Sequence, residues 1–372
     1  MAFDIRVPAH VDRVPAYQPG RSMASVAREF GLKLGGIVKL ASNENPLGMS
    51  PLARASLAEL IDDPSRYPDS DAIALREKLA SRHGVPIEWL TIGSGSAEIL
   101  QLAARSMLAP DRSAISSQYA FTSYVREARA VGARSIVTPA KDYGHDAAAI
   151  LAAITDDTAL IFLANPNNPT GTYWAPARMA DFLAAVPSHV AVLLDEAYVD
   201  FVEDAEKPDS VAWVRRHPNL IVARTFSKIY GMAGMRIGYA VAQAQMTELL
   251  NRLRLTFNVG THALTAAIAA LDDADFVARS RSMTAAGMAS LTRSFDKMGL
   301  PFLPSKGNFV MVKMGDAARI NAHLLRQGVI VRPVANYGLP EWLRITIGLP
   351  EENARFLASL SDSLQKVGEF AG

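Results

Sequence analysis

The sequence contains no cysteine, and this absence removes several kinds of site at once. Without a thiol the chain can form no disulfide, no thiolate metal site and no cysteine nucleophile. The chain also lacks an excess of charge of either sign, since 38 basic residues stand against 37 acidic ones and the net charge is +1. This balance gives no indication of a nucleic-acid-binding surface or of a polybasic membrane patch.

Long apolar runs are missing as well. Stretches such as Val190–Leu194 and Ala263–Leu271 are much shorter than the ~20 residues that a membrane-spanning helix needs. The chain begins MAFDIRVPAH, which contains no apolar signal core, so we expect a cytoplasmic protein. Because 49% of the 372 residues are hydrophobic, the composition is that of a globular protein with a large core, and the length favours one large and one small domain.

Short apolar runs alternate with helical patterns through the middle of the chain. The runs lack a clear alternation of apolar and polar residues, which is typical of strands covered on both faces. The candidate strands are Leu90–Ile92, Ser113–Ser116, Ser135–Thr138, Leu160–Leu163, Val190–Leu194, Leu220–Thr225 and Gly238–Val241. The helical patterns include Ala97–Met107, Asp146–Ile154 and Pro176–Ala185. This alternation predicts an α/β fold with a mainly parallel, seven-stranded sheet and helices on both faces.

The pattern changes after residue 255. A long helical region rich in alanine and leucine, Ala263–Lys297, precedes three more candidate strands and a final helix; these strands are Phe309–Lys313, Val329–Val331 and Leu343–Ile347. We therefore predict a large cofactor-binding domain over residues 46–255 and a small α+β domain over residues 256–372. Residues 1–45, interrupted by prolines, are predicted to form an arm that packs on the small domain, on a partner subunit, or on both.

One lysine lies where a ligand is expected, because open α/β sheets bind ligands at the carboxyl ends of their strands. The segment RTFSKIYGMAGMR, residues 224–236, places Lys228 directly after a strand, with hydroxyls at Thr225 and Ser227 and a guanidinium at Arg236. A lysine taken alone is most often a solvated surface residue. Three other segments that follow strands make a functional role the better interpretation.

The first of these segments is LLDEAY, residues 193–198. A carboxylate that closes an apolar strand is costly without a partner, and Asp195 would suit a protonated pyridine nitrogen of the kind found in pyridoxal-5'-phosphate (PLP). Tyr198 could donate to the ring's phenolate oxygen. An alternative is that Asp195 only caps the next turn.

The other two segments are NPNNPTG, residues 165–171, and TIGSGSAE, residues 91–98. The Asn-Pro steps at Asn165 and Asn168 favour a turn that can hold an amide against a ring hydroxyl. Small residues before a helix expose backbone N–H groups to a phosphate. The third glycine of a dinucleotide motif and the lysine of a P-loop are both absent, so a monophosphate is expected.

Together these segments resemble the aspartate aminotransferase superfamily, the fold-type I PLP enzymes, and within it the histidinol-phosphate aminotransferase family. Three further segments are similar to that family: KLASNENPLG at residues 39–48, RYPD at residues 66–69 and LRITIG at residues 343–348. The resemblance extends from about Tyr17 to Asn353.

The resemblance implies a role for each matching residue. Lys228 would carry PLP as a Schiff base and move the substrate proton. Apart from the resemblance, partial burial and neighbouring positive charge are expected to lower its pKa, and Arg236 and Arg224 are consistent with this. Asp195 would pair with the ring nitrogen, Tyr198 and Asn168 with the ring oxygen, and Tyr119 would stack on the ring. The phosphate would be held by Gly95, Ser96, Ala97, Thr225, Ser227 and Arg236, with Tyr67 joining from the partner subunit of a homodimer. The substrate would contact Arg344, with Arg332, Tyr17 and Asn168 as further candidates, and no metal is expected.

The reaction implied is ping-pong transamination from histidinol phosphate to 2-oxoglutarate, in histidine biosynthesis. Two alternatives stay open on the same fold: an aminotransferase or PLP oxidase for aromatic or specialised amino acids, and a decarboxylase of the threonine-phosphate type. Arg344 would serve a carboxylate as well as a phosphate, and two departures from the family pattern, Ser94 and His262, lie near the expected site. A regulator's effector domain is less favoured, since residues 1–45 show neither a helix-turn-helix pattern nor a basic bias.

Overall fold

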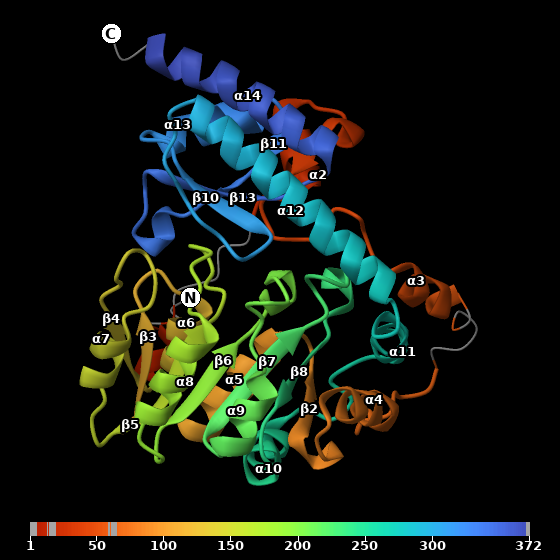
Figure 1. The fold of residues 1–372 in the computed structure, drawn as a ribbon, viewed down its shortest axis with the longest axis vertical. Coiled ribbons are helices and arrows are strands. Elements are labelled where there is room, and N and C mark those ends of the chain that lie inside the picture. The colour runs from red at the N-terminus through yellow and green to blue at the C-terminus, as the bar shows by residue number, and fades with distance from the viewer. Residues whose placement is uncertain (1–5, 13, 15–19, 59, 61–64, 370–372) are drawn as a thin grey trace.

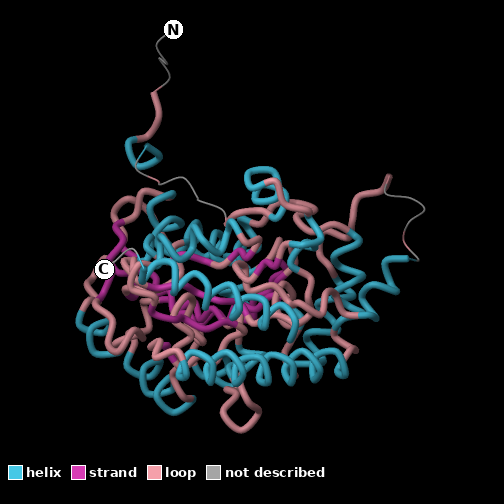
Figure 2. The backbone as a smooth tube through the Cα atoms, turned by 90° about the horizontal axis from the view of Figure 1, so that it is seen from above, coloured by secondary structure: helices cyan, strands magenta, loops and turns pink. Residues whose placement is uncertain are grey.

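The computed structural model describes residues 6–12, 14, 20–58, 60 and 65–369. Tyr17, which the sequence offers as a substrate contact, lies outside these described residues. Figure 2 shows the general arrangement, with strands in the middle of the molecule and helices on both sides of them.

The larger sheet contains seven strands, and each matches one of the apolar runs to within two residues at either end. Their bounds are β2 (Leu90–Gly93), β3 (Ser113–Ser117), β4 (Arg134–Thr138), β5 (Thr158–Ala164), β6 (Ala191–Asp195), β7 (Leu220–Thr225) and β8 (Gly238–Val241). The spatial order is β2-β8-β7-β6-β5-β3-β4. Strand β8 runs antiparallel to β2 and β7, and the remaining neighbours are parallel. The predicted mainly parallel, seven-stranded sheet is confirmed.

Helices cover both faces of this sheet, which is why its inner strands are apolar throughout. One face packs on α5 (Ser96–Met107), α6 (Ser123–Ala130) and α10 (Ala244–Leu253). The other packs on α4 (Ile73–His83), α7 (Ala147–Ala152), α8 (Pro176–Ala185) and α9 (Ser210–Arg216). In Figure 1, α8 and α9 lie in front of the sheet. The edge strand β4 differs from the expectation, because Val137 is 52% exposed.

The second sheet is antiparallel and has four strands in the order β12-β13-β10-β9. These are β12 (Arg332–Pro333), β13 (Trp342–Thr346), β10 (Phe309–Lys313) and β9 (Phe302–Leu303). Its apolar face packs on α12 (Ala274–Lys297), α13 (Ala317–Arg326) and α14 (Pro350–Glu369). An α+β part therefore follows the large sheet along the chain, while the predicted domain bounds stay a prediction.

The N-terminal region is more regular than the sequence suggested. It contains α1 (Ala9–Asp12), α2 (Met23–Phe30) and the short strand β1 (Val38–Lys39). Ser22 caps the start of α2 by accepting from Ser25 N, and Gly31 ends the helix at φ +65°. Strand β1 pairs in parallel with β11 (Val329–Ile330), so this region joins the smaller part of the molecule.

The long helical region expected over residues 263–297 is two helices rather than one. Helix α11 (Thr261–Ala270) packs on α3 (Pro51–Ala58) and α4, and α12 begins at Ala274. Asp273 separates them, because its carboxylate caps α12 at Phe276 N and also accepts from Ser50 Oγ at 2.6 Å. Figure 1 shows α12 crossing from α11 to the smaller sheet.

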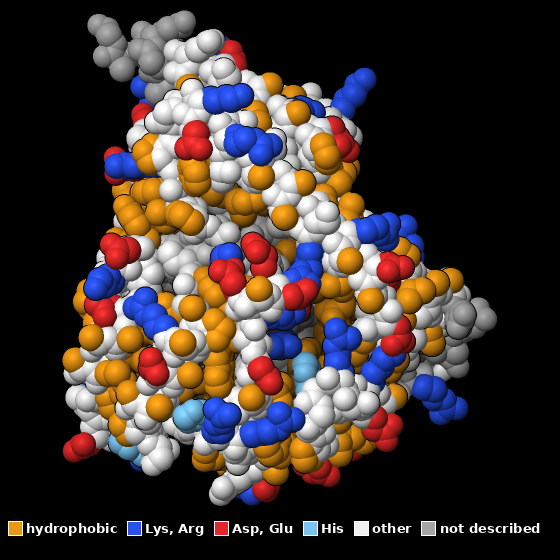
Figure 3. Space-filling model, in the orientation of Figure 1, with side chains coloured by type: hydrophobic (Ala, Val, Ile, Leu, Met, Phe, Trp, Pro, Cys, Tyr) orange, Lys and Arg blue, Asp and Glu red, His pale blue; other side chains and the backbone are white. Residues whose placement is uncertain are grey.

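The surface agrees with the balanced composition. Figure 3 shows acidic and basic side chains interspersed over the face on which α8 and α9 lie. Within the described ranges, no helix combines the length and the apolar character that crossing a membrane requires.

Candidate active site

A cavity of about 540 Å³ opens at the edge of the large sheet where β5, β6 and β7 end. Its walls come from three regions: the loops after these strands, the start of α5 with α6, and residues of the smaller sheet and the N-terminal region. Predicted site residues that line it are Ser96, Ala97, Asn168, Asp195, Tyr198, Thr225, Ser227, Lys228, Arg236, Arg332 and Arg344. The parallel strands account for this convergence, since their carboxyl ends meet at one edge.

Lys228 follows β7 and points into the cavity. Its Nζ donates to the backbone oxygen of Ser42 at 3.1 Å and lies 5.6 Å from the ring centroid of Tyr198. Burial lowers the pKa of Lys228 from 10.5 to about 8, and the positive charge of Arg344 is the next largest cause. Arg236 lowers this pKa further, as the sequence suggested, while negative groups nearby oppose the shift.

Asp195 closes β6 and is buried. Its Oδ2 accepts from the hydroxyl of Tyr124 at 2.9 Å, and its Oδ1 accepts from Ala197 N at 3.2 Å. Burial raises the pKa of Asp195, and the bond from Tyr124 partly offsets that rise. Tyr124 is itself fully buried on α6 and stacks on Phe162 at 5.1 Å. A carboxylate held in this way is suited to bind a protonated ring nitrogen.

The opposite wall carries hydrogen-bonding groups and cations. Tyr198 accepts from Asn43 Nδ2 at 2.9 Å. Arg344 donates from Nη1 to Asn168 Oδ1 and from Nη2 to Ala41 O at 2.7 Å. Arg332 stands opposite Arg344 in the β12–β13 pair, so two guanidinium groups reach the cavity from neighbouring strands. Such a pair suits a phosphate or a carboxylate.

The start of α5 forms a phosphate cradle, by which we mean Gly95, Ser96 and Ala97 together with Thr225, Ser227 and Arg236. Gly95 is the N-cap of α5 at φ +77°, and a Cβ added there would lie 2.6 Å from Arg236 Nη2. A residue with a Cβ would be strained at this positive φ and would also have to displace the guanidinium, so glycine is favoured here. Arg236 donates to Ser227 Oγ at 3.4 Å and to Ala233 O at 3.0 Å. A helix N-terminus beside an arginine and hydroxyls is suited to a monophosphate.

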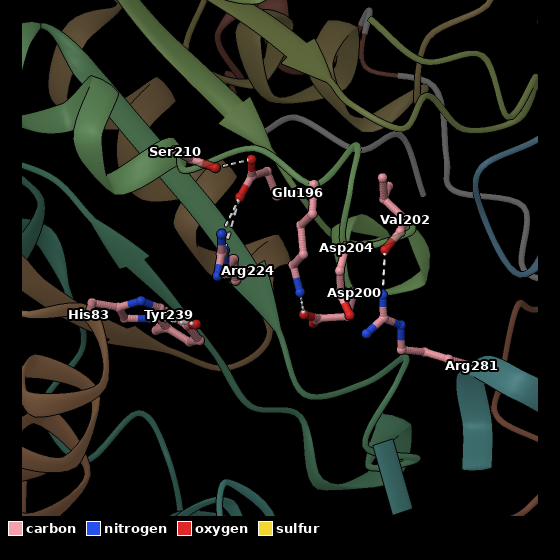
Figure 4. A network of polar contacts seen from close by, with 10 residues as sticks. His83, Glu196, Asp200, Val202, Asp204, Ser210, Arg224, Tyr239 and Arg281 are labelled. Carbon is pink, nitrogen blue, oxygen red and sulfur yellow. Dashed lines mark hydrogen bonds and ion pairs between the residues drawn. The ribbon is translucent and has the colours of Figure 1, made fainter. Parts of the chain in front are cut away.

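A buried ion pair joins the ends of β6 and β7. Arg224 Nε and Nη2 both lie 2.9 Å from Glu196 Oε2, and Ser210 Oγ donates to the other oxygen of Glu196. Figure 4 shows these three side chains pointing toward one another. The charge of Arg224 is paired with Glu196, and Arg344 and Arg236 are the arginines that lower the pKa of Lys228. A contribution of Arg224 to that lowered pKa stays a prediction.

The described residues contain no group of three or more acidic or histidine side chains that could hold a metal ion. The chemistry of the cavity rests instead on one lysine, one buried carboxylate, an anion cradle and two arginines. That donor set fits PLP, whose aldehyde, ring nitrogen and phosphate require these three kinds of group.

Comparison with known proteins agrees with this donor set. Residues 36–360 match the family described as aminotransferase class I and II. The chain belongs to the aminotransferase class I and II family. A curated relative, histidinol-phosphate aminotransferase 2 of Ralstonia nicotianae, is 54% identical over 361 residues, which is 96% of each chain.

Solved structures of aminotransferase-like proteins share the fold. The structure of histidinol-phosphate aminotransferase from Sinorhizobium meliloti in complex with pyridoxal-5'-phosphate has a TM-score of 0.89 at 28% identity, covering 98% of this chain and 99% of its own. The structure of L-threonine-O-3-phosphate decarboxylase from Porphyromonas gingivalis has a TM-score of 0.78 at 25% identity, covering 88% and 100%.

Among the described residues, three predicted site residues do not line the cavity: Gly95, which lies just before Ser96 at the start of α5, Tyr119 and Tyr67. Tyr119, at φ +57°, stacks on Tyr143 at 5.8 Å, and its backbone oxygen accepts from Asn167. Phe121 and Tyr124, which follow Tyr119 in the chain, do line the cavity. Tyr67 is 81% exposed and stacks on Phe257, outside the cavity of its own chain.

Sequence reasoning missed Asn43 and Tyr124. Asn43 lies inside KLASNENPLG, so a signal for it was present in the segment already identified. Tyr124 gave no signal, since an aromatic residue on a helix is usually core. Neither Ser94 nor His262 lines the cavity, and His262 is exposed on α11.

Proposed function

We propose that this chain is a PLP-dependent aminotransferase that transfers the amino group of histidinol phosphate to 2-oxoglutarate by a ping-pong mechanism. The observation that carries the proposal is the position of Lys228, which faces Asp195 and the phosphate cradle with a pKa lowered to about 8. When bound, PLP supplies an electron sink that acidifies the Cα–H bond of the donor. All other steps depend on residues of the chain.

Lys228 serves as the covalent anchor and as the proton carrier. A lysine with a pKa near 8 has a substantial neutral fraction in mildly alkaline solution, and only the neutral amine can attack a carbonyl or accept a proton. Its Nζ donates to Ser42 O, and the side chain lines the cavity. From there it would take the proton from the substrate Cα and deliver it to C4' of the cofactor.

Asp195 and Tyr198 would bind the two polar atoms of the cofactor ring, its nitrogen and its oxygen. Asp195 keeps a proton on the ring nitrogen, and its burial strengthens that interaction. Because Asn43 donates to the oxygen of Tyr198, the hydroxyl hydrogen of Tyr198 is directed toward another acceptor, which we assign as the ring oxygen. Asn168 acts from the same side and is held in place by Arg344.

The two arginines select the anionic end of the substrate. Arg344 is 6% exposed and is fixed by its bonds to Asn168 and Ala41 O, so it presents a preorganised charge. With Arg332 beside it, the pair can take the phosphate of histidinol phosphate in one half-reaction and a carboxylate of 2-oxoglutarate in the other. The name of the Ralstonia relative supports histidinol phosphate as the donor.

A decarboxylase of the threonine-phosphate type is the second candidate, because the Porphyromonas enzyme shares the fold at a TM-score of 0.78. The sequence identity of 54% to a histidinol-phosphate aminotransferase favours transamination over this alternative.

A panel of donors tests the proposal. The purified enzyme is incubated with 2-oxoglutarate and with histidinol phosphate, phenylalanine or threonine phosphate in turn, and glutamate, CO₂ and oxygen uptake are followed. We expect glutamate with histidinol phosphate, and none in the Lys228→Ala variant. Glutamate from phenylalanine alone, CO₂ without glutamate, or oxygen uptake without glutamate would each replace the proposal with one of its alternatives.

The proposal includes a homodimer with shared sites in the cytoplasm. The exposure of Tyr67 supports the dimer, since a large aromatic side chain that is 81% exposed offers contact area to a second chain. The arm, large domain and small domain at residues 1–45, 46–255 and 256–372 are part of the same proposal.

A further inference from the structure

Tyr67 is exposed but held at a defined position. Its ring stacks on Phe257 with centroids 4.5 Å apart and an interplanar angle of 14°. Phe257 adopts φ +58°, a conformation that is uncommon for a bulky side chain, and is 39% exposed itself. We call residues 65–71, which carry this tyrosine, the Tyr67 segment. Most of these residues are exposed, so contacts outside the hydrophobic core must hold the segment.

Arg254 bridges the Tyr67 segment to the loop after α10. Its Nη1 donates to Ser70 O at 2.7 Å and to Asn258 Oδ1 at 2.9 Å, and its Nη2 lies 3.6 Å from a carboxylate oxygen of Asp71. The Arg254 side chain is only 14% exposed. Bonds from a nearly buried guanidinium are worth more than those of a surface pair.

Asn258 continues the connection to the start of α5. Its Nδ2 donates to Glu98 Oε2 at 2.7 Å and to Ile92 O at 3.0 Å. The same oxygen of Glu98 accepts from Ser94 N at 2.5 Å, one residue before the N-cap of α5. Hydrogen bonds therefore run from Ser94, which directly precedes the phosphate cradle, through Glu98, Asn258 and Arg254 to the Tyr67 segment.

The apolar packing in this connection, the stacking of Tyr67 on Phe257, lies at the surface rather than in a core. A second cavity, of about 210 Å³, lies beside it and is lined by Ser70, Asp71, Arg76, Leu90, Ile92, Asn251 and Arg254. A segment that rests on hydrogen bonds next to a polar cavity opens more easily than one packed in a core. Loss of Arg254 would therefore loosen the Tyr67 segment, which would keep the stacking of Tyr67 on Phe257 and the bond from Ile73 N to Asp69 Oδ2 at 2.7 Å.

We propose that Arg254 and Asn258 are positioning residues that fix Tyr67 relative to the phosphate cradle of its own chain. Each subunit then presents its tyrosine in a set orientation to the cofactor phosphate of the other subunit. This inference rests on the proposed function, in particular on the shared sites of the homodimer. Its consequence is that Arg254 acts mainly on the partner's cofactor rather than on that of its own chain.

Hybrid dimers test this directly. A tagged chain that carries Lys228→Ala and Arg254→Gln is paired with an untagged wild-type chain. Only the wild-type chain can then hold PLP covalently. The Tyr67 that reaches this PLP comes from the altered chain. Cofactor trapped by borohydride is measured against PLP concentration. We expect the PLP concentration at half-saturation to be roughly 5- to 10-fold higher than in a hybrid whose tagged chain carries Lys228→Ala alone. This is the effect of losing about one hydrogen bond.

The reciprocal hybrid places Arg254→Gln in the chain that keeps Lys228, and its partner carries Lys228→Ala alone. Here we expect the PLP concentration at half-saturation to change less than twofold. Arg252→Gln is the matched control, because this arginine on α10 has a 66% exposed side chain and pairs only with Glu248 among the contacts described. Arg254→Lys should restore part of the loss.

Three results would overturn the inference: a loss confined to the reciprocal hybrid, equal losses in both hybrids, or no loss in either. A wild-type protein that elutes as a monomer with PLP bound would instead overturn the homodimer of the proposed function. The two failures are therefore distinguishable.

Discussion

At the residue scale, the chemistry of Lys228 follows from burial and from neighbouring positive charge. Burial disfavours the ammonium form, and Arg344 and Arg236 disfavour it further, so the pKa falls from 10.5 to about 8. Neither effect can be seen from the lysine alone, since Arg344 lies 116 residues further along the chain.

The pH dependence of PLP capture by the cofactor-free protein follows from this pKa. Because only the neutral amine attacks the aldehyde, the capture rate should rise with pH and level off above about 8, well below the ordinary lysine value of 10.5. Arg344→Gln should move the midpoint to higher pH, and Arg332→Gln should move it less. Stopped-flow absorbance measures the rate, and a midpoint near 10.5 in the wild type would contradict the account.

The variant Tyr124→Phe tests the role of Asp195, whose pKa is also shifted from its ordinary value. The hydrogen bond from Tyr124 lowers the pKa of Asp195, so its removal should raise that pKa. The acid limb of the kcat/KM profile should therefore move to higher pH, by roughly one unit at most, since one hydrogen bond is worth about 1 kcal/mol. Tyr173→Phe, which loses only a bond to Glu206 O, is the control. A limb that stays in place or moves to lower pH would refute this role.

Much of the site was predictable at this scale because its residues directly follow apolar strands. Asp195, Asn168 and Lys228 were found in this way, and all three line the cavity. Tyr119 was assigned only by resemblance, and the structure places its ring against Tyr143 instead. Tyr124 could not be predicted, because its partner Asp195 is 71 residues away and its pattern is that of a core helix.

At the element scale, the seven strands of the large sheet were predictable because burial on both faces leaves continuous apolar runs. Elements stabilised by distant partners were not. Strand β1 has only two residues and pairs with β11, nearly 300 residues later. The division of α11 from α12 had a local signal, Asp273 as an N-cap, which the high alanine content of the region obscured.

The buried pair of Arg224 and Glu196 should matter for stability. The Glu196 side chain is 1% exposed, so Arg224→Met would leave an unpaired charge in the core beneath β6 and β7. We expect a loss of about 3–5 kcal/mol in the free energy of unfolding. Adding Glu196→Gln to this variant should recover part of the loss, and Arg252→Met, which breaks an exposed pair, should cost less than ~1 kcal/mol. Urea unfolding measures the differences, and equal effects of Arg224→Met and Arg252→Met would contradict the prediction.

At the scale of the whole molecule, the cavity depends on how the two sheets are placed relative to each other. The large sheet supplies Asp195 and Lys228, and the smaller sheet supplies Arg332 and Arg344. Helix α12 connects the parts, because Arg281 donates to Val202 O after β6 at 2.8 Å while the other end of the helix packs in the smaller core.

Dilution should weaken cofactor binding if the sites are shared. Tyr67 can help to hold PLP only in the dimer, so the apparent Kd for PLP should rise once the protein is diluted below its dimer dissociation constant. In Tyr67→Phe this dependence on protein concentration should be reduced. Fluorescence titration at several protein concentrations measures the apparent Kd for PLP, and sedimentation measures the dimer dissociation constant. A Kd that stays constant while the dimer dissociates would exclude a shared site.

The central claim is that Lys228 holds the cofactor, and peptide mapping after borohydride reduction tests it most directly. The purified protein is loaded with PLP, reduced, digested and analysed by mass spectrometry, alongside the Lys228→Ala variant. The account predicts one pyridoxyl phosphate group per chain on the peptide that contains Lys228, and none in the variant. An adduct on a different lysine, or no adduct on the wild-type chain, would contradict it.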